Sequence, residues 1–350
     1  YMLRIPTNDP ALLLTALDVA EDWMSGVSFE PEQVARERQV MLAEWTSSRG
    51  AARRLGEQHR QVLLAGSRYA EREVIGDREV LEHGPAQRLV DFYRSWYRPE
   101  RAAVIVVGAI DPVAVEGAIR ERFARIPASP GASANPVFEI PVRAEPVAAV
   151  LADPEAPATI VALQFKTRAL AVRDEATQRE QLETMLATMI LSRRLEALVQ
   201  APDAPFTGAS SSLAPGVFGA LDLVQLSARA KEGKSQASFD ALLLELERVK
   251  RHGFLQSELD RAKANLLRAL EHAVSAEATA DPYRTAANLA NHFLTGNVVT
   301  SAESDLSLGT RLLGEMTVAA LNARVASWYG TQQQVLLVSG PSREALPEKS

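Results

Sequence analysis

The 350 residues include no cysteine. This excludes disulfide bonds, Cys-ligated zinc, iron–sulfur clusters and a thiol nucleophile, and it fits the periplasm and the cytoplasm equally well. No apolar run approaches the roughly 20 residues of a membrane-spanning helix. The 38 basic and 44 acidic residues give a net charge of −6 without a long run of either sign, which argues against nucleic acid and anionic membranes as partners. The composition indicates a bacterial-type soluble protein of two or three domains.

A repeated segment is the clearest internal pattern. The letters SWYRPERAAVIVVG begin at residue 95 and SWYGTQQQVLLVSG at residue 327, an offset of 232 (327 − 95). In each copy a helix is predicted to end at Trp-Tyr, and an apolar strand internal to its sheet then ends at Gly108 or Gly340. The matched spacing and chemistry predict duplicated domains in which Trp96 and Trp328 occupy equivalent places.

The copies are separated by a connector rich in Pro, Ala and Ser at residues 129–145. Residues 1–128 are therefore predicted to be the C-terminal part of a first domain, 146–342 a second homologous domain, and 343–350 a tail or a linker to further domains. The second Ser-Trp-Tyr lies 181 residues (327 − 146) into its domain and the first lies 94 (95 − 1) into the chain. On this arithmetic we expect the first domain to lack 87 residues (181 − 94) at its N-terminus.

Residues 29–45, FEPEQVARERQVMLAEW, are predicted to form a helix with Pro31 in its first turn. Its apolar residues at positions 34, 40, 41 and 45 recur at helical spacing and form a stripe. Glu37 and Glu44 are seven residues apart, so they lie on nearly the same line of the helix, beside this stripe rather than opposite it. Two carboxylates in such a position are not expected for packing alone.

The same helix can be aligned with the second copy. With Phe29 placed on Leu255, the segment matches LQSELDRAKANLLRAL at an offset of 226. Glu37 then meets Lys263 and Glu44 meets Leu270. In this alignment the two acids are specific to the first copy, which favours a role that the second copy does not share.

These segments, together with residues 69–112 (YAEREVIGDREVLEHGPAQRLVDFYRSWYRPERAAVIVVGAIDP), resemble the pitrilysin or insulinase-type zinc metallopeptidases, the inverted zincins. The resemblance covers residues 1 to about 342 and is strongest from Phe29 to Asp111. It implies tandem homologous α+β domains, each a mostly antiparallel sheet flanked by helices. It also implies a zinc-dependent metalloendopeptidase that hydrolyses peptides or small proteins inside an enclosed chamber.

The resemblance assigns roles to the paired acids. In that family an H-x-x-E-H motif supplies two His ligands to Zn²⁺ and a general-base Glu, and the third ligand is the last Glu of a downstream E-x-x-x-x-x-x-E pair. The matching residues here are Glu44 as the zinc ligand and Glu37 as a partner that hydrogen-bonds a ligand without touching the metal. The alternative is a surface helix whose acids pair with Arg36, Arg38 or solvent.

The sequence departs from the family pattern at the histidines. None of the five forms a pair at H-x-x-E-H or H-E-x-x-H spacing, so two zinc ligands and the base are missing. We expect the missing motif upstream of Tyr1, in the stretch that the repeat arithmetic marks as absent, and we expect the chain as given to be inactive. The five histidines are His59, His83, His252, His272 and His292.

Other motifs favour structural roles. Family members carry an Arg and, several residues later, a Tyr that assist catalysis. Here LSRRLEALVQAPDAPFTGASSS offers Arg193 or Arg194, but Phe206 replaces the phenol, so an oxyanion donor is missing and the second domain is predicted to be inactive. The Gly-Lys-Ser at 233–235 lacks the upstream Gly of a P-loop and is predicted to be a loop. His292 is predicted to lie on a helix face without binding metal.

A non-catalytic protein of the same fold is the alternative function. Such a chain would be a scaffold or would hold substrate for an active peptidase. The retention of Glu37 and Glu44 favours the enzyme, with a peptide substrate and with further homologous domains or a partner subunit closing the chamber. An H-x-x-E-H motif in the sequence immediately upstream of Tyr1 would distinguish the two.

Overall fold

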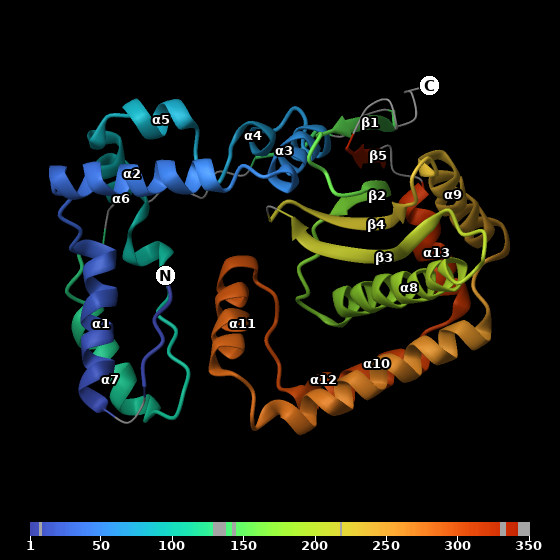
Figure 1. Cartoon of the computed structure of the whole chain (residues 1–350). Helices are drawn as coiled ribbons and strands as arrows, with labels where there is room; N and C mark the ends of the chain where they lie inside the picture. The colour runs from blue at the N-terminus through green and yellow to red at the C-terminus, as the bar shows by residue number, and fades with distance from the viewer. Residues whose placement is uncertain (7–8, 129–137, 142–144, 218, 330–333, 342–350) are drawn as a thin grey trace. The chain divides into compact units, whose positions relative to one another are not determined.

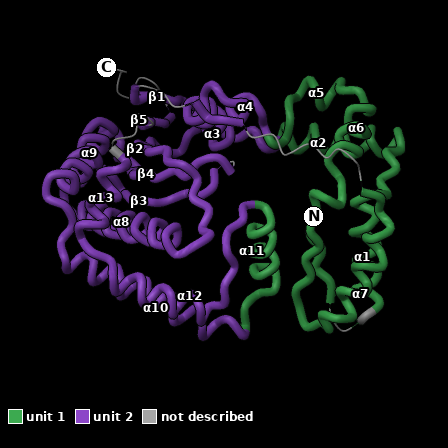
Figure 2. Tube along the Cα trace, turned by 180° about the vertical axis from the view of Figure 1, so that it is seen from behind, with its two compact units in different colours: residues 1–46, 74–137, 279–294 green, residues 47–73, 138–278, 295–350 purple. Residues whose placement is uncertain are grey.

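The computed structural model describes residues 1–6, 9–128, 138–141, 145–217, 219–329 and 334–341 (Figure 1). Its backbone packs into two compact units, which are coloured separately in Figure 2. The first unit comprises residues 1–46, 74–137 and 279–294, and the second comprises residues 47–73, 138–278 and 295–350.

Most of the described chain is helical. The α-helices of the N-terminal part are α1 (Pro10–Ser25), α2 (Pro31–Ser47), α3 (Ala51–Leu63), α4 (Arg68–Glu71), α5 (Arg78–His83), α6 (Ala86–Trp96) and α7 (Pro112–Phe123), with a 3₁₀ turn at Pro99–Arg101. Those that follow are α8 (Glu175–Val199), α9 (Ser235–His252), α10 (Gln256–Glu277), α11 (Pro282–Thr295), α12 (Ala302–Glu315) and α13 (Val318–Tyr329). The strands are β1 (Val147–Ala152), β2 (Thr159–Arg168), β3 (Phe206–Val217), β4 (Leu221–Ala230) and β5 (Gln334–Gly340).

The second unit is built on one five-stranded sheet in the order β1-β5-β2-β4-β3 (Figure 1). Only the β1–β5 pair is parallel, and the other three pairs are antiparallel. Alternate residues of β2 and β4 point to opposite faces, as the two-residue period of a strand requires. The α+β fold class is therefore confirmed, with a mostly antiparallel sheet flanked by helices.

Helices cover both faces of this sheet. On one face, α8, α9 and α13 pack against the strands and α10 and α12 lie behind, forming a core with Leu186, Leu226 and Trp328 at 0–1% exposure. On the other face, Leu63 at the end of α3, Leu64 directly after it and Ala70 of α4 pack with residues of β4 and β5. The segment 47–73, which precedes the first Ser-Trp-Tyr in the chain, thus helps to cover the sheet of the second copy.

The first unit has very little core of its own. Among its described residues only Leu17 and Val115, at 3% and 7% exposure, are buried hydrophobic side chains. Helices α1 and α7 pack together, and Asp111 caps α7 by accepting hydrogen bonds from the backbone N–H groups of Val113 and Ala114. Such a small core offers little hydrophobic stabilisation for a unit of this size.

The structure confirms part of the predicted repeat. Trp96 is the last residue of α6, and Trp328 lies in the last turn of α13. In the second copy β5 ends at Gly340 and lies between β1 and β2, so it is an internal strand as predicted. The two tryptophans differ in burial, because Trp96 is 39% exposed and Trp328 is 1% exposed.

The corresponding strand of the first copy is not formed, so that prediction was wrong. Residues 102–107 have no strand assignment and are half-buried apart from the exposed Ala103. The first unit has no strand among its described residues. A strand is stabilised by hydrogen bonds to neighbouring backbone, and an apolar, β-branched sequence cannot form that ladder without a partner.

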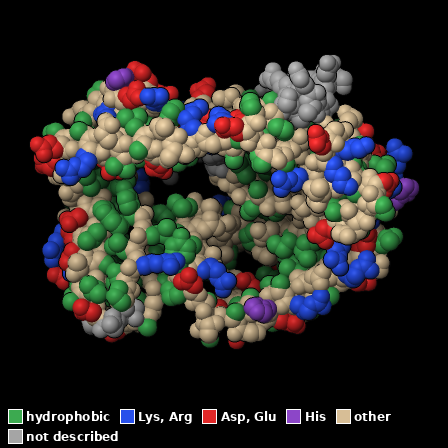
Figure 3. Space-filling model, viewed as in Figure 1, with side chains coloured by type: hydrophobic (Ala, Val, Ile, Leu, Met, Phe, Trp, Pro, Cys, Tyr) green, Lys and Arg blue, Asp and Glu red, His purple; other side chains and the backbone are tan. Residues whose placement is uncertain are grey.

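The two units are defined by backbone packing, and their limits differ from the domain boundaries that the repeat predicts. Those domain boundaries remain a prediction. Of the connector at 129–145, only residues 138–141 and 145 are described, and the tail at 343–350 lies outside the described residues. None of the helices that the structure describes is both long and apolar enough to span a membrane. On the face shown in Figure 3, basic and acidic side chains are interspersed.

Candidate functional site

Helix α2 carries both acids, and it begins at Pro31 as predicted. A half-buried arginine attaches it to the next part of the first unit: Arg38 donates hydrogen bonds of 2.7–2.8 Å to the carbonyl oxygens of Leu81, Glu82 and Gly84. These carbonyls lie at the C-terminal end of α5, where four helix carbonyls lack partners within the helix. Arg38 therefore fixes α2 against α5, and it is not available as a partner for the acids in the way the surface-helix alternative supposes.

Glu37 and Glu44 are both exposed, and no residue of α2 is buried. Three of the four apolar residues of the predicted stripe are half-buried, whereas Val40 is 54% exposed. The stripe is thus only partly covered. The structure places both carboxylates on an open side of α2, and nothing in it assigns them to a metal.

The described residues do not complete a zinc site around Glu44. The only group of three His, Asp or Glu ligand atoms that lie within 4.8 Å of one another in the described part of the chain is Glu79, Glu82 and His83, on the short helix α5. Neither Glu37 nor Glu44 belongs to such a group. A catalytic zinc ion needs three protein ligands, so the residues present do not by themselves fit the metal.

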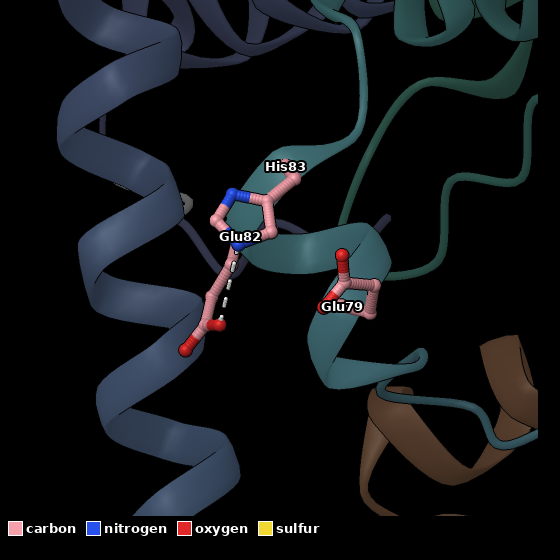
Figure 4. Close-up of side chains that lie close together, drawn as sticks. All are labelled: Glu79, Glu82 and His83. Carbon is pink, nitrogen blue, oxygen red and sulfur yellow. Dashed lines mark ion pairs between the residues drawn. The ribbon is translucent and has the colours of Figure 1, made fainter.

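The Glu79, Glu82 and His83 group is a poor metal site (Figure 4). Glu82 accepts a hydrogen bond of 2.7 Å from Arg78, and its second oxygen lies 3.8 Å from Nε2 of His83. Glu79 and His83 are exposed. These contacts are those of a solvated ion-pair cluster, and such surface pairs contribute little free energy.

The structure shifts the predicted alignment of α2 with α10 by one residue. Helix α2 begins at Pro31 and α10 at Gln256, an offset of 225 (256 − 31). Lys263 of α10 donates a hydrogen bond to the carbonyl oxygen of Met316, the residue after α12. In the same way, Arg38 of α2 donates a hydrogen bond to the carbonyl oxygen of Gly84, the residue after α5. The acceptors are 232 residues apart (316 − 84), which is the offset of the Ser-Trp-Tyr repeat. Arg38, not Glu37, is therefore the counterpart of Lys263.

At this offset three of the four stripe positions of α2 meet apolar residues of α10, whereas Val40 meets Asn265, and the phenylalanines just before the two helices also match. The matched pairs are Phe29 with Phe254, Val34 with Leu259, Met41 with Leu266 and Trp45 with Leu270.

The corrected offset also changes the counterparts of the acids. Glu37 corresponds to Ala262, which is 5% exposed in the core behind the sheet, and Glu44 corresponds to the exposed Ala269. The acids remain specific to the first copy, as predicted. Glu37 occupies a position that faces the domain core in the second copy, where α10 packs against α8 and α12. In the first copy this side of the helix is open.

Arg194 is a structural residue of the second unit. It donates two hydrogen bonds of 2.7 Å to the carboxylate of Glu258, one of 3.1 Å to Glu245 and one of 3.2 Å to the carbonyl of Gly253. Burial raises the pKa of Glu258, but the hydrogen bonds from Arg194 and from the Leu255 N–H outweigh it and hold the pKa below its ordinary value. Arg194 therefore joins α8 to the N-terminal end of α10.

The remaining predicted features also have structural roles. Phe206 is 1% exposed in the core at the start of β3, so no hydroxyl replaces the missing phenol. Arg193 is 78% exposed and lies 3.8 Å from Glu196. Gly233 adopts a φ of +67° in the turn between β4 and α9, which confirms a loop in place of a P-loop. His292 is exposed on α11 and belongs to no ligand group in the described residues.

Comparison with known protein families supports the resemblance. The model described as "Peptidase M16 inactive domain" matches residues 85–266, which is more than half of the chain.

Individual relatives agree with this match. The probable zinc protease PqqL of Escherichia coli K12 is 27% identical over 323 residues, covering 92% of this chain and 34% of the relative. A crystal structure of the first half of the periplasmic protease PqqL from Escherichia coli is 25% identical with a TM-score of 0.91, over 98% of this chain and 74% of that one. Pitrilysin, at 17% identity and a TM-score of 0.63, over 98% of this chain and 36% of that one, shares the fold. The chain spans about a third of the length of its curated relatives.

Proposed function

Because the chain belongs to the peptidase M16 family, we propose that it forms part of a zinc-dependent metalloendopeptidase that hydrolyses peptides or small proteins. The observation that carries this proposal is the pair of exposed acids on α2, which has no acidic counterpart on α10 of the second copy. Two carboxylates that are present in the first copy and have no acidic counterpart in the second are consistent with a specialised role in the first copy.

In this proposal Glu44 supplies one ligand to Zn²⁺, and Glu37 orients a neighbouring ligand by a hydrogen bond. Two His ligands and a general-base Glu come from an H-x-x-E-H helix that these 350 residues do not contain. The position of Glu37 supports the assignment, because its counterpart Ala262 faces the domain core. A helix packed on that side of α2, as the core packs on α10, would meet Glu37, and Glu44 lies on nearly the same line of α2 two turns further along.

The second homologous domain, proposed to span residues 146–342, has no catalytic part in this scheme. Arg194 is held by two carboxylates and Phe206 is in the core, so neither is free to stabilise an oxyanion. We propose that this domain forms one wall of the chamber in which the peptide is held. The periplasmic description of the related Escherichia coli protease supports a periplasmic location.

The chain as given is expected neither to hold stoichiometric zinc nor to cleave peptides. One or two carboxylates do not make a selective zinc site, and Glu44 belongs to no group of three ligand atoms within the described residues. Zinc content measured by atomic absorption after dialysis, with hydrolysis of a quenched fluorescent peptide, tests this. Stoichiometric zinc with chelator-sensitive cleavage would contradict the prediction.

The proposed function itself is tested in a protein extended upstream by about 90 residues, the length that the repeat arithmetic predicts. Stoichiometric zinc and peptide cleavage in the extended protein, both lost with a chelator, are the expected results. An extended protein that folds but holds no zinc would favour the non-catalytic scaffold, the reading consistent with the family description as an inactive domain.

A further inference from the structure

Helix α3 is seated on the sheet of the second unit by apolar and polar contacts. Residues 47–73, which contain it, belong to that unit (Figure 2). Leu55 and Val62 of α3 pack against a cluster formed by residues of β1, β2 and β5. Nε2 of His59 lies 2.7 Å from Oε1 of the buried Gln164 of β2. These contacts hold the body of α3 on the sheet.

Arg54, in the first turn of α3, joins the sheet to the connection that precedes this helix. Its Nε and Nη2 atoms donate hydrogen bonds of 2.5 and 2.8 Å to the two carboxylate oxygens of Asp153, the residue directly after β1. Its Nη1 atom donates a hydrogen bond of 2.5 Å to the carbonyl oxygen of Arg49. A guanidinium is planar and presents its donors in a fixed fork, so binding Asp153 on one side also fixes the direction of Nη1 on the other.

Asp153 attaches this set of hydrogen bonds to the sheet. Its side chain is 5% exposed, and its backbone N–H donates a hydrogen bond of 3.0 Å to the carbonyl oxygen of Gly340 at the end of β5. The hydrogen bonds from Arg54 hold the pKa of the Asp153 carboxyl below its ordinary value, so the carboxylate stays charged at neutral pH. Arg54 is therefore held by a nearly buried anion at the edge of the sheet.

The acceptor Arg49 lies in the short connection between α2 and α3. Helix α2 ends at Ser47 and α3 begins at Ala51. Glu44 lies three residues before the end of α2, within its last turn, and the backbone hydrogen bonds of a helix make one turn move as a unit. Fixing the carbonyl of Arg49 therefore restrains the turn that carries Glu44.

We propose that Asp153 and Arg54 are positioning residues, through which the sheet of the second unit restrains the end of α2 that carries Glu44. The role of Glu44 rests on the proposed function, whereas the restraint on α2 does not. The proposed second domain, to which Asp153 belongs, then does more than form a wall of the chamber, because it restrains the turn that carries the proposed ligand.

Hydrogen exchange of Asp153→Asn in the chain as given tests the restraint. Asparagine keeps an acceptor for the Glu155 N–H, which donates to Oδ1 of Asp153 over 3.0 Å, but its NH₂ group cannot accept the second hydrogen bond from Arg54. Amides of residues 45–50 are expected to exchange about 10-fold faster, because a hydrogen bond between charged groups is lost. The β5 amides of residues 335–338 should not change. Equal exchange of 45–50 in both proteins, or faster exchange of both segments, would overturn the proposal.

Glu155→Gln is the matched control. Glu155 accepts a hydrogen bond of 2.6 Å from the same guanidinium, but its side chain is 72% exposed, so its loss should leave the exchange of residues 45–50 unchanged. Arg54→Lys keeps the charge without the fork and should match Asp153→Asn. Combining these two substitutions should add nothing, because Asp153 acts through Arg54. Additive effects would show that Asp153 acts independently, and the proposal would be wrong.

The link to Glu44 is tested in the upstream-extended protein. There Asp153→Asn is expected to lower kcat roughly 10 to 100-fold with KM nearly unchanged, since a misplaced group slows turnover without removing a contact to the peptide. An unchanged kcat would overturn the positioning role of Asp153. If the native extended protein cleaves no peptide, the proposed function fails, and the exchange of residues 45–50 still decides whether the restraint exists.

Discussion

Replacing Glu44 by glutamine in the upstream-extended protein is expected to abolish stoichiometric zinc binding and to reduce peptide hydrolysis by at least about 100-fold. Glutamine keeps the shape of the side chain but removes the negative charge that offsets part of the charge of Zn²⁺. In the chain as given, Glu44 is exposed and α2 has no buried residue, so the same substitution should leave the thermal midpoint of that chain nearly unchanged.

Glu37→Gln should have a smaller effect on the same readouts. A residue that orients a ligand without binding the metal typically accounts for roughly 10 to 100-fold in metal affinity or activity. Zinc affinity measured by competition with a chromogenic chelator would place Glu37→Gln between the native protein and Glu44→Gln. The reverse order would show that Glu37, not Glu44, is the ligand.

Glu32→Gln is the matched control for both substitutions. Glu32 is an exposed acid in the first turn of the same helix, outside the spaced pair. It should retain full zinc and full activity. If Glu44→Gln behaves in the same way as Glu32→Gln, then the acids are an ordinary solvated helix face and the surface-helix alternative is correct.

The sequence was a good guide wherever local rules determine the structure. The proline in the first turn of α2 and the glycine that ends β5 both mark the observed boundaries. Local chemistry also explains the one-residue error in the alignment of α2 with α10. The predicted offset of 226 places Glu32 on Glu258 and so matches two acids, but Glu258 is the ion-pair partner of Arg194, and its acidity reflects that tertiary contact. The correct offset between α2 and α10 is indicated by the matched apolar residues. It is also indicated by the hydrogen bonds that Arg38 and Lys263 donate to the carbonyls just after α5 and α12.

Long-range packing could not be predicted in the same way. Residues 102–107 have the composition of a strand, but a strand forms only where another backbone offers hydrogen bonds. Likewise, no local pattern indicates that α3 covers the second sheet, where Arg54 forms hydrogen bonds of 2.5 and 2.8 Å with Asp153, 99 residues away. The placement of Glu44 near other zinc ligands depends on contacts of this kind, and so it stays a prediction.

The second large effect is expected at Arg194, whose replacement by methionine should destabilise the second unit by about 3 kcal/mol. The side chain of Arg194 is 19% exposed, and those of its partners Glu245 and Glu258 are 5% and 14% exposed. Removing the cation leaves two nearly buried carboxylates without their main partner, which costs more than the pair itself contributes. Urea denaturation followed by the fluorescence of Trp328 would measure the loss.

Arg193→Met is the matched control, since the Arg193 side chain is 78% exposed and its ion pair with Glu196 is 3.8 Å long. It should change the free energy of unfolding by less than about 0.5 kcal/mol. Combining Arg194→Met with Glu245→Gln and Glu258→Gln should restore part of the stability, because no carboxylate is then left unpaired. Equal effects of the two single arginine substitutions would show that the ion pairs of Arg194 contribute nothing.

The pH dependence of the Arg194→Met penalty separates the ion pair from simple loss of packing. Because the folded-state pKa of Glu258 lies below its ordinary value, the ion pair stabilises the fold above the unfolded pKa of about 4.3, and this stability is lost as the pH falls through the folded pKa. The difference in unfolding free energy between the native chain and Arg194→Met should therefore shrink on acidification below about pH 4. A difference that stays constant from pH 7 to pH 3 would mean that Arg194 acts through its packing on Phe254, whose ring centroid lies 5.3 Å from the guanidinium carbon.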